Sequence, residues 1–261
     1  MSVLDLAEPT FRDDDIPRPV VAKGFDYPDG HVTRPHWHRR GQLLYCSTGV
    51  VMVTTPAGAW MMPPQRGMWI PPETVHDVRM LGPVRMQSLY LEPAAARGMP
   101  ERCEVVGIPP LMRSLLAAAV TLPSEYDYDG RDGALMTLIQ HEIQLLPPLP
   151  LSLPLPSHEV LADRCRAFVL SPTSHDTIDD WGRGLGMSRR TFTRLFRRET
   201  GLSFVEWRQQ ACLMAALPRL AAGERVTIVA IDLGYNNPAA FTAMFKRALG
   251  SSPRSYFEQH R

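Results

Sequence analysis

Short apolar runs separated by glycine and proline occupy the chain up to about Pro93. Runs of this length between turn residues are typical of β-strands. The predicted strands are Gln42–Thr48, Val50–Thr55, Ala59–Met62, Gly67–Ile70 and Val84–Leu91. Pro56-Ala57-Gly58 predicts a hairpin turn between the second and third of these runs. Many short strands with regular turns favour a small barrel or sandwich.

From about residue 108 to 146 the apolar positions recur at helical spacing instead. They are Leu111, Leu115, Leu116 and Ala119, followed by Leu135, Leu138, Ile139, Ile143 and Leu146. The pattern leaves two interpretations open: the helices cover the barrel, or they form a surface at which two chains dimerise.

A proline-rich segment follows, with five prolines in the ten residues from Pro147 to Pro156. Proline lacks an amide hydrogen and restricts φ, so this segment excludes a helix and favours an extended, semi-rigid spacer. The predicted fold class is therefore α+β. It has a β-barrel at 1–100, a helical linker and candidate dimerisation region at 101–156, and an all-α domain at 157–261.

Two short helices joined by a glycine turn are predicted after Thr177. Thr177 is a helix N-cap with an acidic residue three positions on, and Gly186 suits a turn that needs positive φ. Ser188 caps the second helix, whose buried stripe is Phe192, Leu195 and Phe196. Its opposite face carries Arg189, Arg190, Thr193, Arg194, Arg197 and Arg198. This pattern predicts a helix-turn-helix, because arginine and threonine reach bases and phosphates in the major groove.

The same arrangement returns about 48 residues later. Val226–Leu233 predicts a first helix, Gly234 a turn, and Pro238–Leu249 a second helix with Phe241, Met244 and Phe245 buried. The turn of this copy is one residue longer.

Between the copies, Ser203 and Glu206 form a capping box that opens a helix towards Ala222. Such a helix is about 30 Å long, which is close to the ~34 Å between major-groove faces one turn apart. One chain would then place two recognition helices in successive grooves. Pro218 is expected to kink or break this helix, so the spacing is approximate. Gly182 and Gly184, inside the first predicted helix, each cost up to about 1 kcal/mol relative to alanine.

Charge is distributed unevenly, although the net charge is only +1. Residues 157–261 hold 15 Lys and Arg against 10 Asp and Glu, a net charge of +5, and the remaining 13 and 17 leave −4. A basic domain attracts phosphate.

The four cysteines form no C-x-x-C pair, and no run reaches the ~18 apolar residues of a membrane span. The first fifteen residues show no secretory signal, so we expect a cytoplasmic protein with no membrane partner.

The back half, over about 158–258, resembles the DNA-binding domain of the AraC family of bacterial regulators. The resemblance rests on Ala230–Pro253 and on Gly186–Phe196. It implies two helix-turn-helix units joined by a linker helix. By position it implies base contacts from Arg190, Thr193 and Arg194, and from Asn237, Ala239, Thr242 and Ala243. Ala239 and Ala243 are small, so we expect weaker base readout and more phosphate anchoring from the second unit. The candidate DNA-binding residues are Arg189, Arg190, Thr193, Arg194, Arg197, Asn236, Asn237, Thr242 and Lys246.

The front half resembles a cupin barrel, as in the cupin-sensor branch of the AraC family. Gly30, His36, His38 and Gly49 fit the first cupin motif, but Gln42 replaces the usual glutamate. Pro71 and His76 are similar to the second motif, with Glu73 where glycine is typical.

Two histidines at i and i+2 on one strand point the same way. With a third histidine and a side-chain oxygen they would hold a divalent metal, which is the one cofactor considered. The alternative is that His36, His38, Gln42 and His76 line an effector pocket without metal. Glutamine is a weaker ligand than glutamate, which counts against a metal.

These patterns lead to a transcription regulator, an activator or a repressor, that binds operator DNA under the control of a small-molecule effector. Its expected partners are double-stranded DNA, the effector and RNA polymerase, with a homodimer as an alternative to a monomer. No catalytic residue is expected. Two other hypotheses are a cupin-type metalloenzyme with a vestigial helical tail and a nonspecific architectural DNA protein. The arginine face counts against the metalloenzyme, and the modest net charge counts against the architectural protein.

Overall fold

The computed structural model describes residues 8–9, 15–149 and 151–258 of the 261. The chain forms two compact units, one of Met1–Pro56 with Trp60–Pro150 and one of Ala57–Ala59 with Leu151–Arg261. The first fifteen residues, for which no secretory signal is expected, lie mostly outside the described part. Among the helices of the described residues, none is long and apolar enough to cross a membrane.

The first unit is built on a mainly antiparallel sheet, in which the short β1 pairs in parallel with β3. Along the sheet the strands follow the order β1-β3-β7-β4-β6-β8-β9, and β2 pairs with β7. The strands are β1 Glu8–Pro9, β2 Val20–Tyr27, β3 Val32–Trp37, β4 Gly41–Thr55, β5 Gly58–Met62, β6 Arg66–Ile70, β7 His76–Leu91, β8 Glu104–Gly107 and β9 Pro148–Leu149.

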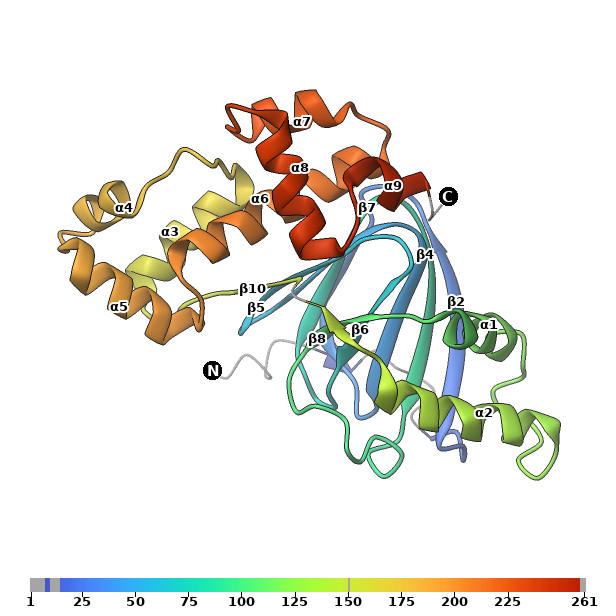
Figure 1. Ribbon diagram of the computed structural model, residues 1–261. Helices are drawn as coiled ribbons and strands as arrows, with labels where there is room; N and C mark the ends of the chain where they lie inside the picture. Colours follow the sequence, from blue (N-terminus) through green and yellow to red (C-terminus); the bar gives the residue numbers. More distant parts are fainter. Residues whose placement is uncertain (1–7, 10–14, 150, 259–261) are drawn as a thin grey trace. The chain divides into compact units, whose positions relative to one another are not determined.

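The longest strands, β4 and β7, pair along almost their whole length (Figure 1). We predicted two strands separated at Gly49, and this is wrong, because β4 continues through the glycine for 15 residues. The register shifts on both sides of Thr48, and Gly49 has a φ of 76°. A Cβ on Gly49 would lie 2.4 Å from the Pro83 carbonyl oxygen, so the glycine marks a bulge where the strands approach closely. The predicted turn at Pro56 is confirmed.

Two helices, α1 (Pro110–Ala119) and α2 (Arg131–Glu142), pack on one face of this sheet. Met112 and Leu116 of α1 are fully buried in a core shared with Leu43, Trp69 and Leu89 of the sheet. The predicted stripe is displaced by one position at its start, since Leu111 is 49% exposed and Met112 replaces it in the core. The helices therefore cover the sheet, which was the first of our two interpretations, and belong to its compact unit, although our domain bounds placed them in a linker at 101–156.

The proline-rich segment is extended in its described residues, as predicted. After a 3-10 turn at Ile143–Leu145 it contributes β9 and β10 (Ser152–Pro154). It is not an exposed spacer, because Leu151 and Leu153 are buried. The carbonyl of Pro154 accepts a hydrogen bond of 2.8 Å from the indole nitrogen of the buried Trp207. This segment is therefore part of the second unit from Leu151 onward.

The second unit is helical and contains both predicted helix-turn-helix units (Figure 1). Its helices are α3 Glu159–Leu170, α4 Ile178–Gly184, α5 Arg189–Thr200, α6 Phe204–Ala221, α7 Val226–Asp232, α8 Pro238–Leu249 and α9 Pro253–Glu258. The pair α4–α5 is the first unit and α7–α8 the second, and α6 joins them.

Aromatic side chains form the core around α4 and α5. The ring of Trp181 lies 4.8 Å from that of Phe204 and 6.2 Å from that of Phe192. Gly182 of α4 has a low helix propensity, but the packing explains its presence. A Cβ at this position would lie 3.0 Å from the Met187 carbonyl oxygen in the turn before α5. The small residue therefore permits close packing of the two helices.

Of the two outcomes expected at Pro218, a kink or a break, the break does not occur, because the linker helix α6 continues to Ala221. Pro218 lies in its last turns, where the missing amide removes one intrahelical bond while the packed face holds the helix. Leu213, Leu217 and Leu220 of this face are buried. The predicted capping box of Ser203 and Glu206 is confirmed.

Candidate nucleic-acid interface and histidine cluster

The outer face of α5 is a continuous polar surface that carries the arginines predicted from the sequence. Ser188 begins the helix by accepting a hydrogen bond from the Thr191 amide, and Gly201 ends it with a φ of 74°. Phe192 and Phe196 are fully buried, which orients the helix. The exposed residues opposite them are Arg189, Arg190, Thr193, Arg194, Arg197 and Arg198. A face of this kind can donate to base edges and to phosphates.

These arginines differ in their partners. Arg189 pairs with Asp179 of α4 at 3.0 Å, and Arg198 pairs with Glu199 at 3.0 Å. Arg190, Arg194 and Arg197 form no ion pair with any described residue. Arg190 and Arg194 therefore present guanidinium groups without a competing carboxylate, as bidentate contact with a base requires.

The corresponding face of α8 offers fewer long polar side chains. The Asn237 side chain caps the helix, accepting a hydrogen bond of 2.8 Å from the Ala239 amide, so its oxygen is engaged within the protein. Thr242 is half-buried, whereas Asn236 and Lys246 are exposed. This helix is better suited to phosphate contacts and close backbone approach than to base readout.

The two helix-turn-helix units are connected by direct contacts beyond α6. The Ser174 amide donates to the Leu233 carbonyl oxygen at 2.8 Å, and its hydroxyl donates to the Gly234 carbonyl oxygen. Arg208 of α6 donates to the Asp176 carbonyl oxygen. The loop before α4 is thus held against the turn of the second unit, and sequence patterns gave no sign of these pairings.

Glu199, near the end of α5, holds the start of α3. Its Oε2 accepts from the Ser157 hydroxyl at 2.5 Å and from the Ser157 and His158 amides, each at 3.2 Å. These hydrogen bonds, with the guanidinium of Arg198, lower the pKa of Glu199 to about 2. The carboxylate therefore links the recognition helix to the point where the proline-rich segment enters α3.

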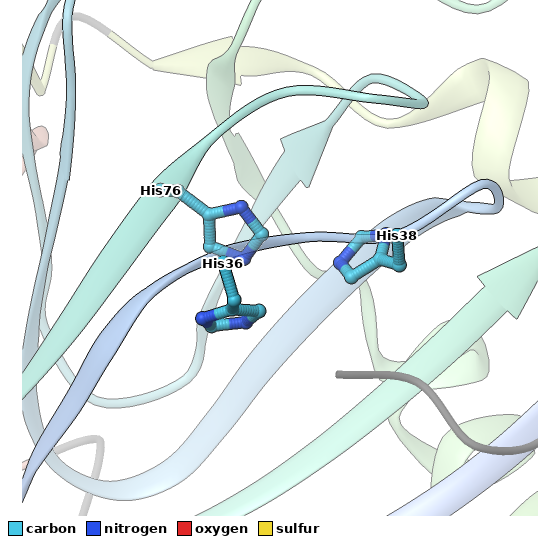
Figure 2. A group of neighbouring side chains, drawn as sticks. All are labelled: His36, His38 and His76. Carbon is cyan, nitrogen blue, oxygen red and sulfur yellow. The ribbon is translucent and has the colours of Figure 1, made fainter. Parts of the chain in front are cut away.

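Three histidines converge in the first unit (Figure 2). His36 is on β3, His38 follows that strand, and His76 begins β7, where it pairs with His36. One nitrogen of each ring lies within 4.8 Å of the others. The ring centroids of His36 and His76 are 4.3 Å apart, and those of His38 and His76 are 5.2 Å apart. The structure thus brings together the histidines that the motif resemblance selected.

The Nδ1 atom of each histidine faces a backbone carbonyl oxygen. The distances are 2.8 Å from His36 to Arg34, 2.5 Å from His38 to Arg40, and 2.8 Å from His76 to Thr74. A carbonyl only accepts, so each Nδ1 carries a hydrogen, and Nε2 is the ring atom through which a neutral imidazole would accept a donor or bind a metal. Nε2 of His76 is buried without a hydrogen-bond partner. Burial and the neighbouring His36 and His38 lower the pKa of His76 to about 3, which keeps the ring neutral.

Gln42 completes the cluster. Its Oε1 lies 3.0 Å from Nε2 of His38, and its amide nitrogen donates to Ser88 at 2.9 Å and to Tyr90 at 3.3 Å. Two acceptors at this separation suit a cation or a hydrogen-bond donor placed between them. Three imidazoles and an amide oxygen are a donor set that fits a first-row divalent metal, and the orphaned Nε2 of His76 fits it as well. Sequence reasoning missed Ser88 and Tyr90 of β7, because strand pairing places them beside Gln42: Tyr90 is the register partner of Gln42, and Ser88 is two residues away on the same strand.

Two families match the chain over separate regions. The family described as an AraC-like ligand binding domain matches residues 18–146, and the family described as a helix-turn-helix domain matches residues 181–259.

Among individual proteins, the chain is 34% identical over 221 residues to the HTH-type transcriptional regulator NimR of Escherichia coli (strain K12), covering 85% of this chain and 81% of that protein. It is 30% identical over 105 residues to the HTH-type transcriptional regulator RipA of Corynebacterium glutamicum, covering 40% of this chain and 31% of that protein. The DNA-binding domain of AdpA, solved with a target DNA, is 30% identical over 38% of this chain and 91% of that chain, with a TM-score of 0.37.

Proposed function

The chain belongs to the AraC family of HTH-type transcriptional regulators, and from this premise we propose that it binds operator DNA mainly through α5. The observation that supports this is the exposed face of α5, where Arg190 and Arg194 have no carboxylate partner among the described residues. Bidentate contact of arginine with guanine is the commonest specific contact in the major groove. The second unit, with Asn236, Asn237, Thr242 and Lys246, mainly anchors the protein on phosphates.

Footprinting of the full chain on the DNA upstream of its gene tests this proposal. We expect a protected segment that spans two successive major grooves, and its loss in the Arg190→Ala/Arg194→Ala variant. The matched control is Arg34→Ala/Arg97→Ala, which removes two exposed arginines of the first unit. Binding of equal strength to scrambled DNA would contradict sequence-specific regulation and favour an architectural role.

The N-terminal domain is an AraC-like ligand-binding domain, and we infer that its small-molecule effector binds at the histidine cluster. The support is geometric, since His36, His38, Gln42 and His76 turn hydrogen-bonding atoms towards one another. If a divalent metal is resident, these four residues hold it, and it supplies a Lewis acid to which an oxygen or nitrogen of the effector binds. Without metal, a flip of the Gln42 side-chain amide exchanges its oxygen and nitrogen, so that the nitrogen donates to Nε2 of His38. The cluster then forms hydrogen bonds with the effector directly.

Equilibrium dialysis of purified chain against Zn²⁺ separates these two versions. Stoichiometric binding that the His36→Ala/His76→Ala variant loses supports the metal. His175→Ala, which removes an exposed histidine of the second unit, is the control. Equal uptake by both variants, or no uptake by wild type, removes the metal from the proposal and leaves the pocket.

We propose that the chain regulates without catalysing a reaction, acting on RNA polymerase at the promoter and located in the cytoplasm. Its relative NimR is a transcriptional regulator, which supports this over the metalloenzyme alternative.

We also propose that the chain forms a homodimer. The support is that Leu138, on α2, and Leu145, just beyond it, are 40% and 73% exposed. Light scattering of wild type and of Leu138→Glu/Leu145→Glu tests this; a wild-type monomer at all concentrations would contradict it.

A further inference from the structure

A cavity lies in the first unit, apart from the histidine cluster. Its volume is about 230 Å³, and its walls come from β4, β6 and β8 and from the segments around Met99 and Leu146. Leu43, Trp69, Val106 and Ile143 line it and belong to the core beneath α1 and α2. The cavity is therefore on the helix-covered face of the sheet, whereas Gln42, the neighbour of Leu43 on β4, points to the opposite face with the histidines.

The cavity walls are mostly apolar and held in place. Leu43 and Trp69 are paired residues of adjacent strands. The Trp69 side chain is 1% exposed, and its indole nitrogen donates to the Pro100 carbonyl oxygen at 2.8 Å. An apolar ligand body would displace water from these walls at little cost in protein rearrangement.

Glu104 adds a carboxylate to the lining. Its Oε1 accepts a hydrogen bond of 2.7 Å from Nε of Arg102, and the Arg102 side chain is 84% exposed. The Glu104 side chain is only 20% exposed, whereas its partner guanidinium is largely in solvent, so a ligand cation in the cavity can take the place of Arg102 beside this carboxylate. A carboxylate beside an indole ring is a combination that recognises organic cations.

The size of the cavity limits the ligand. A volume of about 230 Å³ corresponds to roughly eight water molecules at ~30 Å³ each. This is enough for one aromatic ring with a short side chain and too little for a nucleotide or a long acyl chain. Leu146 and Pro148 also line the cavity, a few residues before Leu151 opens the second unit.

We propose that this cavity is a binding site for a small organic cation with an aromatic or compact apolar body. The proposal adds a ligand class to the sensor unit and rests on the ligand-responsive function above. Binding to this site can be measured without DNA, so its failure is distinct from a failure of operator recognition.

Isothermal titration of the full chain with phenethylammonium tests the proposal. We expect saturable binding to one site per chain, and at least tenfold weaker binding of the neutral 2-phenylethanol, which has the same size. Glu104→Gln should weaken phenethylammonium binding at least tenfold. Glu101→Gln, an exposed carboxylate of the same segment, should leave it unchanged. Val106→Phe, which fills the cavity, should abolish it.

Three results would overturn the proposal. The first is no saturable binding of phenethylammonium to wild type, and the second is equal binding by Glu104→Gln and wild type. The third is that His38→Ala, at the histidine cluster, loses binding while Val106→Phe retains it. Circular dichroism checks that Val106→Phe folds. If it does not, Glu104→Gln against Glu101→Gln decides, since both replace carboxylates outside the buried core.

Discussion

Arg190, Arg194 and Arg197 are distinguished from the other two arginines of α5 by forming no ion pair within the described part of the chain. Arg189 and Arg198, by contrast, each face a carboxylate at 3.0 Å. The two arginines for which the resemblance implies base contacts, Arg190 and Arg194, are among those without a carboxylate partner. Freedom from competing carboxylates, together with the positions that the resemblance selects, supports our proposal that Arg190 and Arg194 read bases.

Replacement of Arg194 by alanine should therefore reduce specificity more than overall affinity. We expect a loss of about 1–3 kcal/mol at the preferred operator and a smaller loss on random DNA, because a bidentate base contact disappears. Gel-shift titrations on both DNAs measure the difference. An equal loss on the two would identify Arg194 as a phosphate contact.

Glu199 should stabilise the second unit in a pH-dependent way. Its pKa is about 2 in the folded chain, below the ordinary value of 4.5, so its contribution is complete above about pH 4.5 and disappears as the pH falls towards 2. Glu199→Gln should lower the free energy of unfolding at neutral pH, and the gap to wild type should shrink below about pH 4.5. Urea titrations between about pH 7 and 3.5 measure it.

The control for that experiment is Glu159→Gln, which removes a carboxylate from the same end of α3 without affecting the Ser157 and His158 donors. It should change stability less than Glu199→Gln. A gap that is constant with pH would show that the Glu199 carboxylate does not act through its ionised form.

Helices and strands show where local signals suffice and where packing prevails. The caps at Thr177, Ser188 and Ser203 act as predicted, because a cap depends on residues within one turn. The strand break predicted at Gly49 does not occur, and at Pro218, where a kink or a break was expected, the helix is not broken. Strand pairing with β7 and the buried face of α6 outweigh the local preference at these positions.

Pro218 should accordingly reduce the free energy of unfolding, because it removes a hydrogen bond from α6. Pro218→Ala restores an amide that can bond the Met214 carbonyl oxygen, and we expect a gain of about 1–3 kcal/mol in the free energy of unfolding. Pro238→Ala is the matched control, because proline at the first position of α8 costs nothing there and its removal should give no gain. Chemical denaturation measures both. Equal effects of the two variants would show that Pro218 causes no strain.

The whole chain separates charge between its halves, with +5 on residues 157–261 and −4 on the remainder. This division matches the two compact units, whose boundary lies at Pro150 and Leu151. The basic unit alone therefore accounts for attraction to phosphate, although the chain as a whole is nearly neutral. Affinity for DNA should fall as salt rises.

The double variant Lys246→Ala/Arg247→Ala should reveal the anchoring role of the second helix-turn-helix. Both side chains are exposed on α8. Binding should weaken by a similar factor on operator and random DNA, and the slope of log affinity against log salt should fall in magnitude by about 2. Arg34→Ala/Arg97→Ala in the acidic unit should leave the slope unchanged. A change confined to the operator would instead assign base readout to α8.

Sequence alone determined the two helix-turn-helix units, their caps and their arginine face, because periodicity, capping and glycine turns are local signals. Their boundaries were predicted almost to the residue, as in Pro238–Leu249. Resemblance, not periodicity, selected His36, His38, Gln42 and His76. Tertiary structure decided the rest: helices α1 and α2 cover the sheet, β4 runs through Gly49, and Glu199 reaches Ser157. The cavity beside Glu104 was likewise not predictable from the sequence pattern. Each of these depends on pairing between residues distant in sequence, which no local pattern encodes.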